Sequence, residues 1–148
     1  MGIVFDTGED GFRTVMKDYQ EMAMRIIWGS DRPLSSRDVW IGVNKGFEGT
    51  GSISRASVIN FLNAMCDEGV LAYGDETGRG GYHRMYSPGL GEEGFKRHVA
   101  KTVVSKLLET WPDETRETYR TWEGLKLNSN VTVPRSPLVI PIVLCVRG

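Results

Sequence analysis

The sequence is poor in cysteine, with only Cys66 and Cys145 among its 148 residues. Two cysteines this far apart form neither a CxxC pair nor a zinc-finger spacing, which argues against a disulfide scaffold and a structural zinc site. Cys66 falls inside a helical pattern, where we expect it to pack as a small hydrophobic residue. This cysteine usage is typical of a reducing compartment.

Long hydrophobic runs are also missing. The first residues, MGIVFDTGEDGF, are acidic and have no extended apolar core, so they do not resemble a signal peptide. The most apolar stretch, Leu138 to Val146, contains Pro141 and is far shorter than the roughly 20 residues of a membrane-spanning helix. We therefore expect a cytoplasmic protein with no membrane span.

The chain lacks a basic excess. Its net charge is −1 and its pI about 6.1, so a nucleic-acid-binding role has to rest on local charge placement. Residues 1–88 hold nine Lys/Arg and twelve Asp/Glu, a balance of 9 − 12 = −3. If the chain binds DNA, we expect the acids of a loose N-terminal arm, Asp6, Glu9 and Asp10, to lie away from the bound groove.

Signs of an enzyme are missing as well. The sequence shows no paired nucleophile and base, no metal-ligand spacing and no glycine-rich phosphate loop between a strand and a helix. The GRGG stretch lies in a hairpin tip, which is the wrong context for phosphate binding. His98 is expected on a helix surface. We predict no catalysis, no cofactor and no metal.

Helical periodicity dominates the first half of the chain. One helix is predicted from Phe12 to Trp28, strongest from Asp18 onward, and a second from Ser36 to Lys45 with Ser35 as its N-cap. After a glycine-rich loop, Ser54 is the expected N-cap of a third helix, which Gly69 ends as a C′ glycine.

This third helix has two faces when successive residues are placed about 100° apart. The apolar face gathers Val58, Ile59, Leu62, Met65 and Cys66, with Phe61 at its edge. The opposite face gathers small and polar residues: Ala56, Ser57, Asn60, Asn63, Ala64 and Asp67. The apolar face predicts packing on a core, whereas the polar face is either solvated or shaped to enter a nucleic-acid groove.

Two further elements follow the third helix. A β-hairpin with a long glycine-rich tip is predicted up to Pro88, with Arg84 on one side of its second strand and His83 on the other. A longer helix then repeats apolar residues at four-residue intervals up to Trp111, and a short helix beginning near Pro112 is expected after it. We assign this apolar stripe to a dimer seam, although it could instead close the core of the monomer.

The order of helix, helix, helix, hairpin and long helix is that of a winged helix-turn-helix. We predict an α+β, mainly α fold: a three-helix core with a β-hairpin wing and an additional C-terminal dimerisation helix. The expected organisation is a flexible arm (1–11), a winged helix-turn-helix DNA-binding domain (12–88), a helical dimerisation region (89–127) and an apolar tail of unknown role (128–148).

Three segments resemble a known family. MAMRIIWGSDRPLSSRDVW, ISRASVINFLNAMCDEGVL and GYHRMYSP are similar to the corresponding parts of the penicillinase-repressor (BlaI/MecI-like) transcriptional regulators. The resemblance implies a homodimeric DNA-binding repressor whose helix beyond the wing forms the dimer. The chain departs from the family in its longer, glycine-rich loop before the third helix and in the stretch after Trp111.

The candidate DNA contacts follow from groove geometry. A recognition helix presents its N-terminal residues to base edges, where small side chains permit close approach. Asn60 could pair with adenine, and Ser57 could reach bases or phosphate. The predicted DNA-binding residues are Ser36, Arg37, Ser54, Arg55, Ala56, Ser57, Asn60, Arg79, His83 and Arg84. Arg55 is expected to bind phosphate, and the three hairpin residues to clamp the backbone or the minor groove.

The predicted dimerisation residues are Phe95, Val99, Val103, Leu107, Leu108 and Trp111. The expected partners are therefore double-stranded operator DNA and a second copy of the chain, with an unidentified effector or protein partner left open. The alternative is a winged-helix protein–protein interaction module without direct DNA readout, which the acidic balance and the apolar tail favour.

Overall fold

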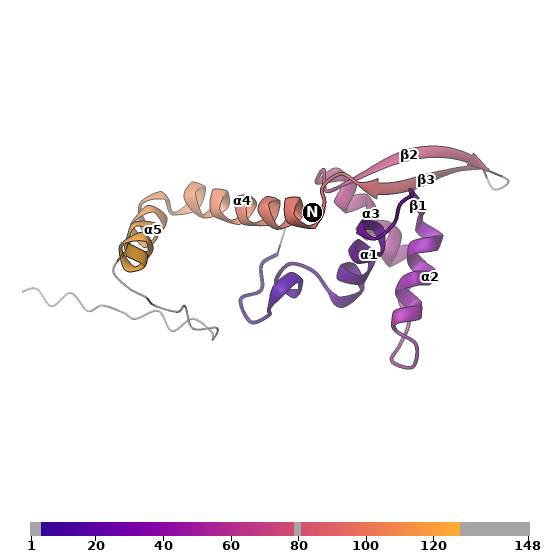
Figure 1. Cartoon of the computed structure of the whole chain (residues 1–148), viewed down its shortest axis with the longest axis horizontal. Helices are drawn as coiled ribbons and strands as arrows, with labels where there is room; N and C mark the ends of the chain where they lie inside the picture. Colours follow the sequence, from indigo (N-terminus) through magenta and orange to yellow (C-terminus); the bar gives the residue numbers. More distant parts are fainter. Residues whose placement is uncertain (1–3, 79–80, 128–148) are drawn as a thin grey trace, which may run out of the picture. The chain divides into compact units, whose positions relative to one another are not determined.

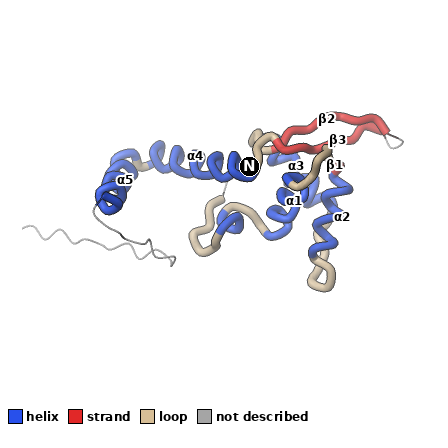
Figure 2. The backbone as a smooth tube through the Cα atoms, in the orientation of Figure 1, coloured by secondary structure: helices blue, strands red, loops and turns tan. Residues whose placement is uncertain are grey.

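The computed structural model describes residues 4–78 and 81–127, with side-chain surroundings as far as residue 123. The chain divides into two compact units, Met1–Lys106 and Leu107–Gly148. The elements, shown in Figures 1 and 2, are the 3-10 helix η1 (Gly11–Thr14), α1 (Asp18–Trp28), β1 (Leu34–Ser35), α2 (Ser36–Gly46), α3 (Arg55–Asp67), β2 (Leu71–Gly78), β3 (Gly81–Pro88), α4 (Glu92–Thr110) and α5 (Pro112–Leu127). The predicted tail (128–148) lies outside the described residues.

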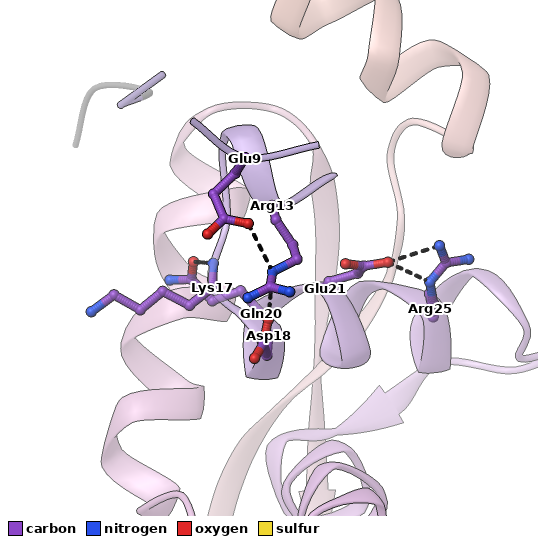
Figure 3. A network of polar contacts seen from close by, with 7 residues as sticks. All are labelled: Glu9, Arg13, Lys17, Asp18, Gln20, Glu21 and Arg25. Carbon is purple, nitrogen blue, oxygen red and sulfur yellow. Dashed lines mark hydrogen bonds and ion pairs between the residues drawn. The ribbon is translucent and has the colours of Figure 1, made fainter. Parts of the chain in front are cut away.

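The prediction of α1 is confirmed from Asp18 to Trp28 and wrong before it. The chain is extended at Lys17, so the segment from Phe12 forms only the short η1. The Gln20 side-chain oxygen accepts a hydrogen bond from the Lys17 backbone N–H at 2.8 Å and helps define the helix start. Just before it, Arg13 bridges Glu9 at 3.3 Å and Asp18 at 3.1 Å, which joins the N-terminal segment to α1 (Figure 3).

The start of α2 is a reciprocal capping box, as the Ser35 prediction requires. The Ser35 hydroxyl accepts a hydrogen bond from the Asp38 backbone N–H at 3.2 Å, and the Asp38 carboxylate accepts one from the Ser35 N–H at 3.0 Å. The carboxylate also accepts the Ser35 hydroxyl proton at 2.8 Å. These hydrogen bonds, the side-chain one foremost, lower the pKa of Asp38.

The glycine-rich loop between α2 and α3 is closed by Asn44. The Asn44 side-chain oxygen accepts a hydrogen bond from the Ile53 N–H at 2.8 Å, and its amide donates to the Ile53 carbonyl at 3.1 Å. The Trp40 indole N–H donates to the same carbonyl at 2.8 Å. The Asn44 side chain therefore bonds both the N–H and the carbonyl of Ile53, as the backbone of a neighbouring strand would. These bonds fix the end of the loop and so the start of α3.

Replacing Asn44 with alanine is expected to lower the free energy of unfolding by about 1–3 kcal/mol, because the partly buried Ile53 N–H loses the Asn44 oxygen that accepts its hydrogen bond. Chemical denaturation measures this change. Thr50→Ala is the control, since the Thr50 hydroxyl bonds only the Phe47 carbonyl within the exposed loop, at 3.1 Å. Equal stability of the Asn44 variant and wild type would show that the loop is held by other contacts.

The sheet is three-stranded and antiparallel, in the order β1–β3–β2. β1 is too short to have been predicted; it pairs Leu34 with Tyr86 and Ser35 with Met85. The wing hairpin is longer than the sequence suggests, because β2 and β3 stay paired as far as Gly78 and Gly81 (Figure 1). With β1 included, the order of elements through β3 is that of a winged helix.

One core joins α1, α2 and α3 to the sheet and to the start of α4. Its most deeply buried side chains are Met24, Ile27, Val39, Val43, Val58, Leu62 and Val70. A Cβ at Gly42 of α2 would lie 2.8 Å from the Ile26 Cδ1 atom of α1, so the Ile26 side chain packs directly against the Gly42 backbone. Phe61, expected at the edge of the apolar face of α3, is also in this core and is 4% exposed.

Phe95 corrects the predicted dimer seam. It is 3% exposed and packs in the monomer core with Phe12 and Trp28, at ring-centroid distances of 5.9 and 5.8 Å. The Trp28 indole N–H donates to the Leu90 carbonyl at 2.9 Å and ties this aromatic cluster to the chain just before α4. Val99 is partly buried against the same core. The first turns of α4 therefore belong to the monomer, because aromatic rings of η1 and α1 cover them.

The second unit exposes large apolar side chains. Trp111 is 58% exposed, and Tyr119 and Trp122 on α5 are 63% and 58% exposed. Leu107 and Leu108, at the end of α4, are more than a third exposed. Thr115 ties the start of α5 to the end of α4, with its hydroxyl donating to the Leu107 carbonyl at 3.2 Å. Within residues 4–78 and 81–127, no helix is long and apolar enough to cross a membrane.

Candidate nucleic-acid interface

The third helix presents the face that the sequence predicts. Val58, Phe61 and Leu62 are buried, which turns Ala56 and Asn60 to solvent. The helix ends as predicted, with Glu68 as C-cap and Gly69 at a φ of 73°, a left-handed conformation that favours glycine. Asp67 is exposed as well and places a negative charge near the C-terminal end of the helix.

The N-termini of α2 and α3 are joined by a side-chain contact. The Arg55 guanidinium donates to the Ser36 hydroxyl at 3.4 Å, across the two helices. Ser54 caps α3 by accepting the Ser57 N–H at 3.1 Å, and the Ser54 and Ser57 hydroxyl oxygens lie 2.9 Å apart. Arg37 and Arg55 are exposed, and in the described part of the chain neither forms an ion pair. Free cations thus lie at helix ends that favour anions.

The wing meets α3 through Arg84. Its guanidinium donates to the Asn63 side-chain oxygen at 2.9 Å and lies over the Tyr73 ring, 4.2 Å from the ring centroid. The Tyr86 hydroxyl donates to the same Asn63 oxygen at 3.0 Å. Burial raises the pKa of Tyr86, so the hydroxyl stays a hydrogen-bond donor near neutral pH. Arg84 is therefore held in place at the edge of the α3 face.

The other predicted wing residues are placed differently. His83 is exposed, lies opposite Glu76 in the hairpin register, and is separated from the α3 contact by strand alternation. His83 and Arg84 therefore lie on opposite sides of β3, as the sequence predicts. Arg79 lies outside the described residues.

A cleft follows the opposite flank of α3. It has a volume of about 620 Å³, and its walls include Ser57 and Asn60 of α3 together with Val4 and Asp6 of the N-terminal segment. The Asp6 N–H donates to the Thr14 carbonyl at 2.7 Å, which folds this segment back on itself. The acids of the N-terminal segment were expected away from the groove face; Asp6 instead lies beside it, because this backbone contact brings the segment toward α3.

Two residues near α3 have roles that sequence reasoning missed. Asn63 was assigned only to the polar face, and the helical wheel could not show that Arg84 and Tyr86 converge on it. His98 was expected on a helix surface; it is half-buried, and its Nε2 atom lies 4.0 Å from the Glu68 carboxylate at the end of α3. Both contacts join segments distant in sequence, so only the folded chain reveals them.

The fold of this chain is similar to that of a solved structure described as a possible transcriptional regulator. A protein from Methanosarcina mazei Go1, described as a possible transcriptional regulator, aligns with a TM-score of 0.50 and 14% identity over 73% of this chain and 80% of that chain. A protein from Thermoplasma acidophilum with a similarly provisional description aligns at 0.41, with 16% identity over 68% of this chain and 90% of that chain. At these identities the likeness concerns the fold alone, and it rests on the first alignment.

No protein-family model matches the sequence, and no curated protein matches it either. The resemblance to penicillinase repressors therefore stays a prediction.

Proposed function

We propose that the chain is a sequence-specific DNA-binding transcriptional regulator, a homodimer that represses by occupying a pseudo-palindromic operator. The observation that carries this proposal is the solvent-facing side of α3, with Ala56 and Asn60 at its centre and Arg84 anchored at its edge. Winged-helix proteins of this order place the third helix in the major groove. That the chain represses transcription, and does not activate it, is inferred from the resemblance to penicillinase repressors.

The proposal divides the contacts into two kinds. Arg55, Arg37 and Ser36, at the paired helix N-termini, would bind phosphates and set the orientation of the protein. Asn60 and Ser57 would reach base edges, since the amide donor and the acceptor of Asn60 form no hydrogen bond with other described residues. Few free cations flank this face, so base contacts have to supply a large share of the affinity.

Arg55→Gln is expected to weaken binding to specific and random DNA by a similar factor, because a lost phosphate contact carries no sequence information. The slope of log Kd against log salt concentration is expected to fall by about 0.9. Fluorescence anisotropy over a salt series measures both. Arg120→Gln on α5, an exposed arginine that is not among the proposed contacts, is the control. An unchanged salt slope for the Arg55 variant would remove Arg55 from the interface.

The proposed dimer uses the second unit. Leu107, Leu108 and Trp111 remain candidates for the seam, together with Tyr119 and Trp122, which the sequence prediction did not include. An unpaired surface with this many exposed aromatic residues is unusual for a monomer. Val103 is half-buried and stays a candidate, whereas Phe95 is committed to the monomer core.

Leu107→Glu combined with Trp111→Glu is expected to convert the dimer into a monomer, because two charges would enter an apolar seam. Light scattering during size-exclusion chromatography measures the mass. Both side chains are exposed, so the monomer fold is expected to persist in the circular dichroism spectrum. Ser105→Glu, also exposed on α4, is the matched control. A dimeric mass for the double variant would show that Leu107 and Trp111 do not form the dimer interface.

The proposed function is tested by a mobility shift with the DNA upstream of the protein's own gene. A salt-sensitive, sequence-dependent shift at micromolar protein is expected, and its absence overturns the proposal. The alternative, a protein-interaction module, is favoured by the acidic balance of residues 1–88 and by the exposed aromatic residues of the second unit. That alternative predicts a partner whose binding survives acidic substitutions on α3.

A further inference from the structure

The side-chain amide of Asn63 is fixed in one orientation. Its oxygen faces both the Arg84 guanidinium, at 2.9 Å, and the Tyr86 hydroxyl, at 3.0 Å. A guanidinium has donors and no acceptor, so the Asn63 atom facing it must be the oxygen. Reversing the amide would set its NH2 group against the donors of Arg84. The chemistry of arginine therefore decides the orientation.

The orientation leaves Asn63 with only donors to offer. Both lone-pair directions of its oxygen are taken by Arg84 and Tyr86, and the second contact holds because the raised pKa of Tyr86 keeps that hydroxyl protonated. In the part of the chain that the structure describes, the NH2 group forms no hydrogen bond, and it is not completely buried.

Asn60 differs in this respect. Neither its oxygen nor its NH2 group forms a hydrogen bond with another described residue, so it can pair with adenine through one donor and one acceptor. Asn63 cannot make that pair, because its acceptor is already used. The two asparagines are three residues apart, or about 4.5 Å along α3. This separation is close to the rise of about 3.4 Å between base pairs.

We infer that Asn63 is a donor-only specificity residue, which selects a base with acceptors in the major groove next to the base that Asn60 reads. Guanine, with acceptors at N7 and O6, fits best, and thymine O4 fits with one hydrogen bond. Cytosine presents its N4 donor to the NH2 group of Asn63 and is excluded at this position. The inference rests on the proposed function, in which α3 occupies the major groove.

Asn63→Asp provides a matched variant. A carboxylate oxygen still accepts hydrogen bonds from Arg84 and Tyr86, so the link between α3 and the wing persists. The outward group changes from a donor to an acceptor, and acceptors on acidic side chains favour the cytosine N4 donor. Asn63→Ala removes the side-chain amide that is proposed to contact the base. Thr77→Asp, at an exposed wing position, controls for the added negative charge.

The experiment is selection from random duplex DNA by the full-length chain and by each variant. Wild type is expected to enrich guanine, or thymine at lower frequency, at one position of each half-site. Asn63→Asp is expected to shift that position to cytosine by about tenfold in relative enrichment, and Asn63→Ala to lose the preference there. Thr77→Asp is expected to select the wild-type sequence with lower affinity.

The outcomes separate the inference from the proposed function. If wild type enriches a motif and Asn63→Asp enriches the same bases, the inference is wrong while the DNA-binding function stands. If wild type enriches no sequence, both fail. Thermal melting of each variant shows whether the fold is intact. A motif changed by Asn63→Ala and Asn63→Asp in the same way would make Asn63 a positioning residue, which also contradicts direct readout.

Discussion

Phe95→Ala is expected to lower the free energy of unfolding by about 3–5 kcal/mol, the largest change in stability we predict for a single substitution. The phenyl ring is 3% exposed and contacts the rings of both Phe12 and Trp28. Its removal leaves a cavity where η1, α1 and the start of α4 meet. Chemical denaturation at several protein concentrations measures the change.

The dependence on concentration separates the two roles considered for Phe95. A core residue shifts the unfolding midpoint equally at all protein concentrations, whereas a seam residue acts through the dimer and its effect varies with concentration. Leu108→Ala, at an exposed position of the proposed seam, is the comparison. A small, concentration-dependent effect for Phe95→Ala would show that Phe95 acts in the dimer interface and not in the monomer core.

Ser57→Glu combined with Asn60→Glu is expected to abolish specific DNA binding, with a loss of at least about 100-fold in affinity. The two carboxylates would face base edges and phosphates, and they remove the donors and acceptors proposed to read sequence. The fold is expected to tolerate both changes. Ser57 occupies the third helical position after the Ser54 cap, where a glutamate completes a capping box, and Asn60 is exposed.

Two acidic substitutions outside the proposed DNA contacts control for net charge. Ser105→Glu with Thr121→Glu changes the charge equally at exposed positions of α4 and α5. Anisotropy titration is expected to show near wild-type affinity for this control. Wild-type affinity in the α3 variant would rule out groove entry by α3 and favour the protein-interaction module.

Much of the fold follows from short-range patterns in the sequence. The caps of α2 and α3 are local, because Ser35 and Ser54 bond backbone groups three residues away. The apolar face of α3 is equally local, since helical periodicity fixes which side chains point inward. These features place the helices and expose Asn60 without knowledge of the tertiary structure.

The rest depends on contacts distant in sequence. The two-residue β1 has too few residues to give a pattern, and it exists because β3 provides an edge. Apolar residues at four-residue intervals do not show which side chains are covered by other parts of the chain. The pattern therefore predicts Phe95 at the dimer seam. Helical periodicity places Asn63 on the polar face of α3. The orientation of its amide is fixed by Arg84 and Tyr86, more than twenty positions further along the chain.

Ser35 belongs to two elements at once. It pairs with Met85 in the sheet and caps the first turn of α2. A displacement of the wing at Met85 would therefore reach Ser36 through its neighbour Ser35 and, through the Ser36 hydroxyl, Arg55. DNA that bends beneath the wing would displace these residues and so shift the phosphate contacts proposed for α2 and α3. Operators that differ in stiffness would then differ in affinity even where every contacted base is the same.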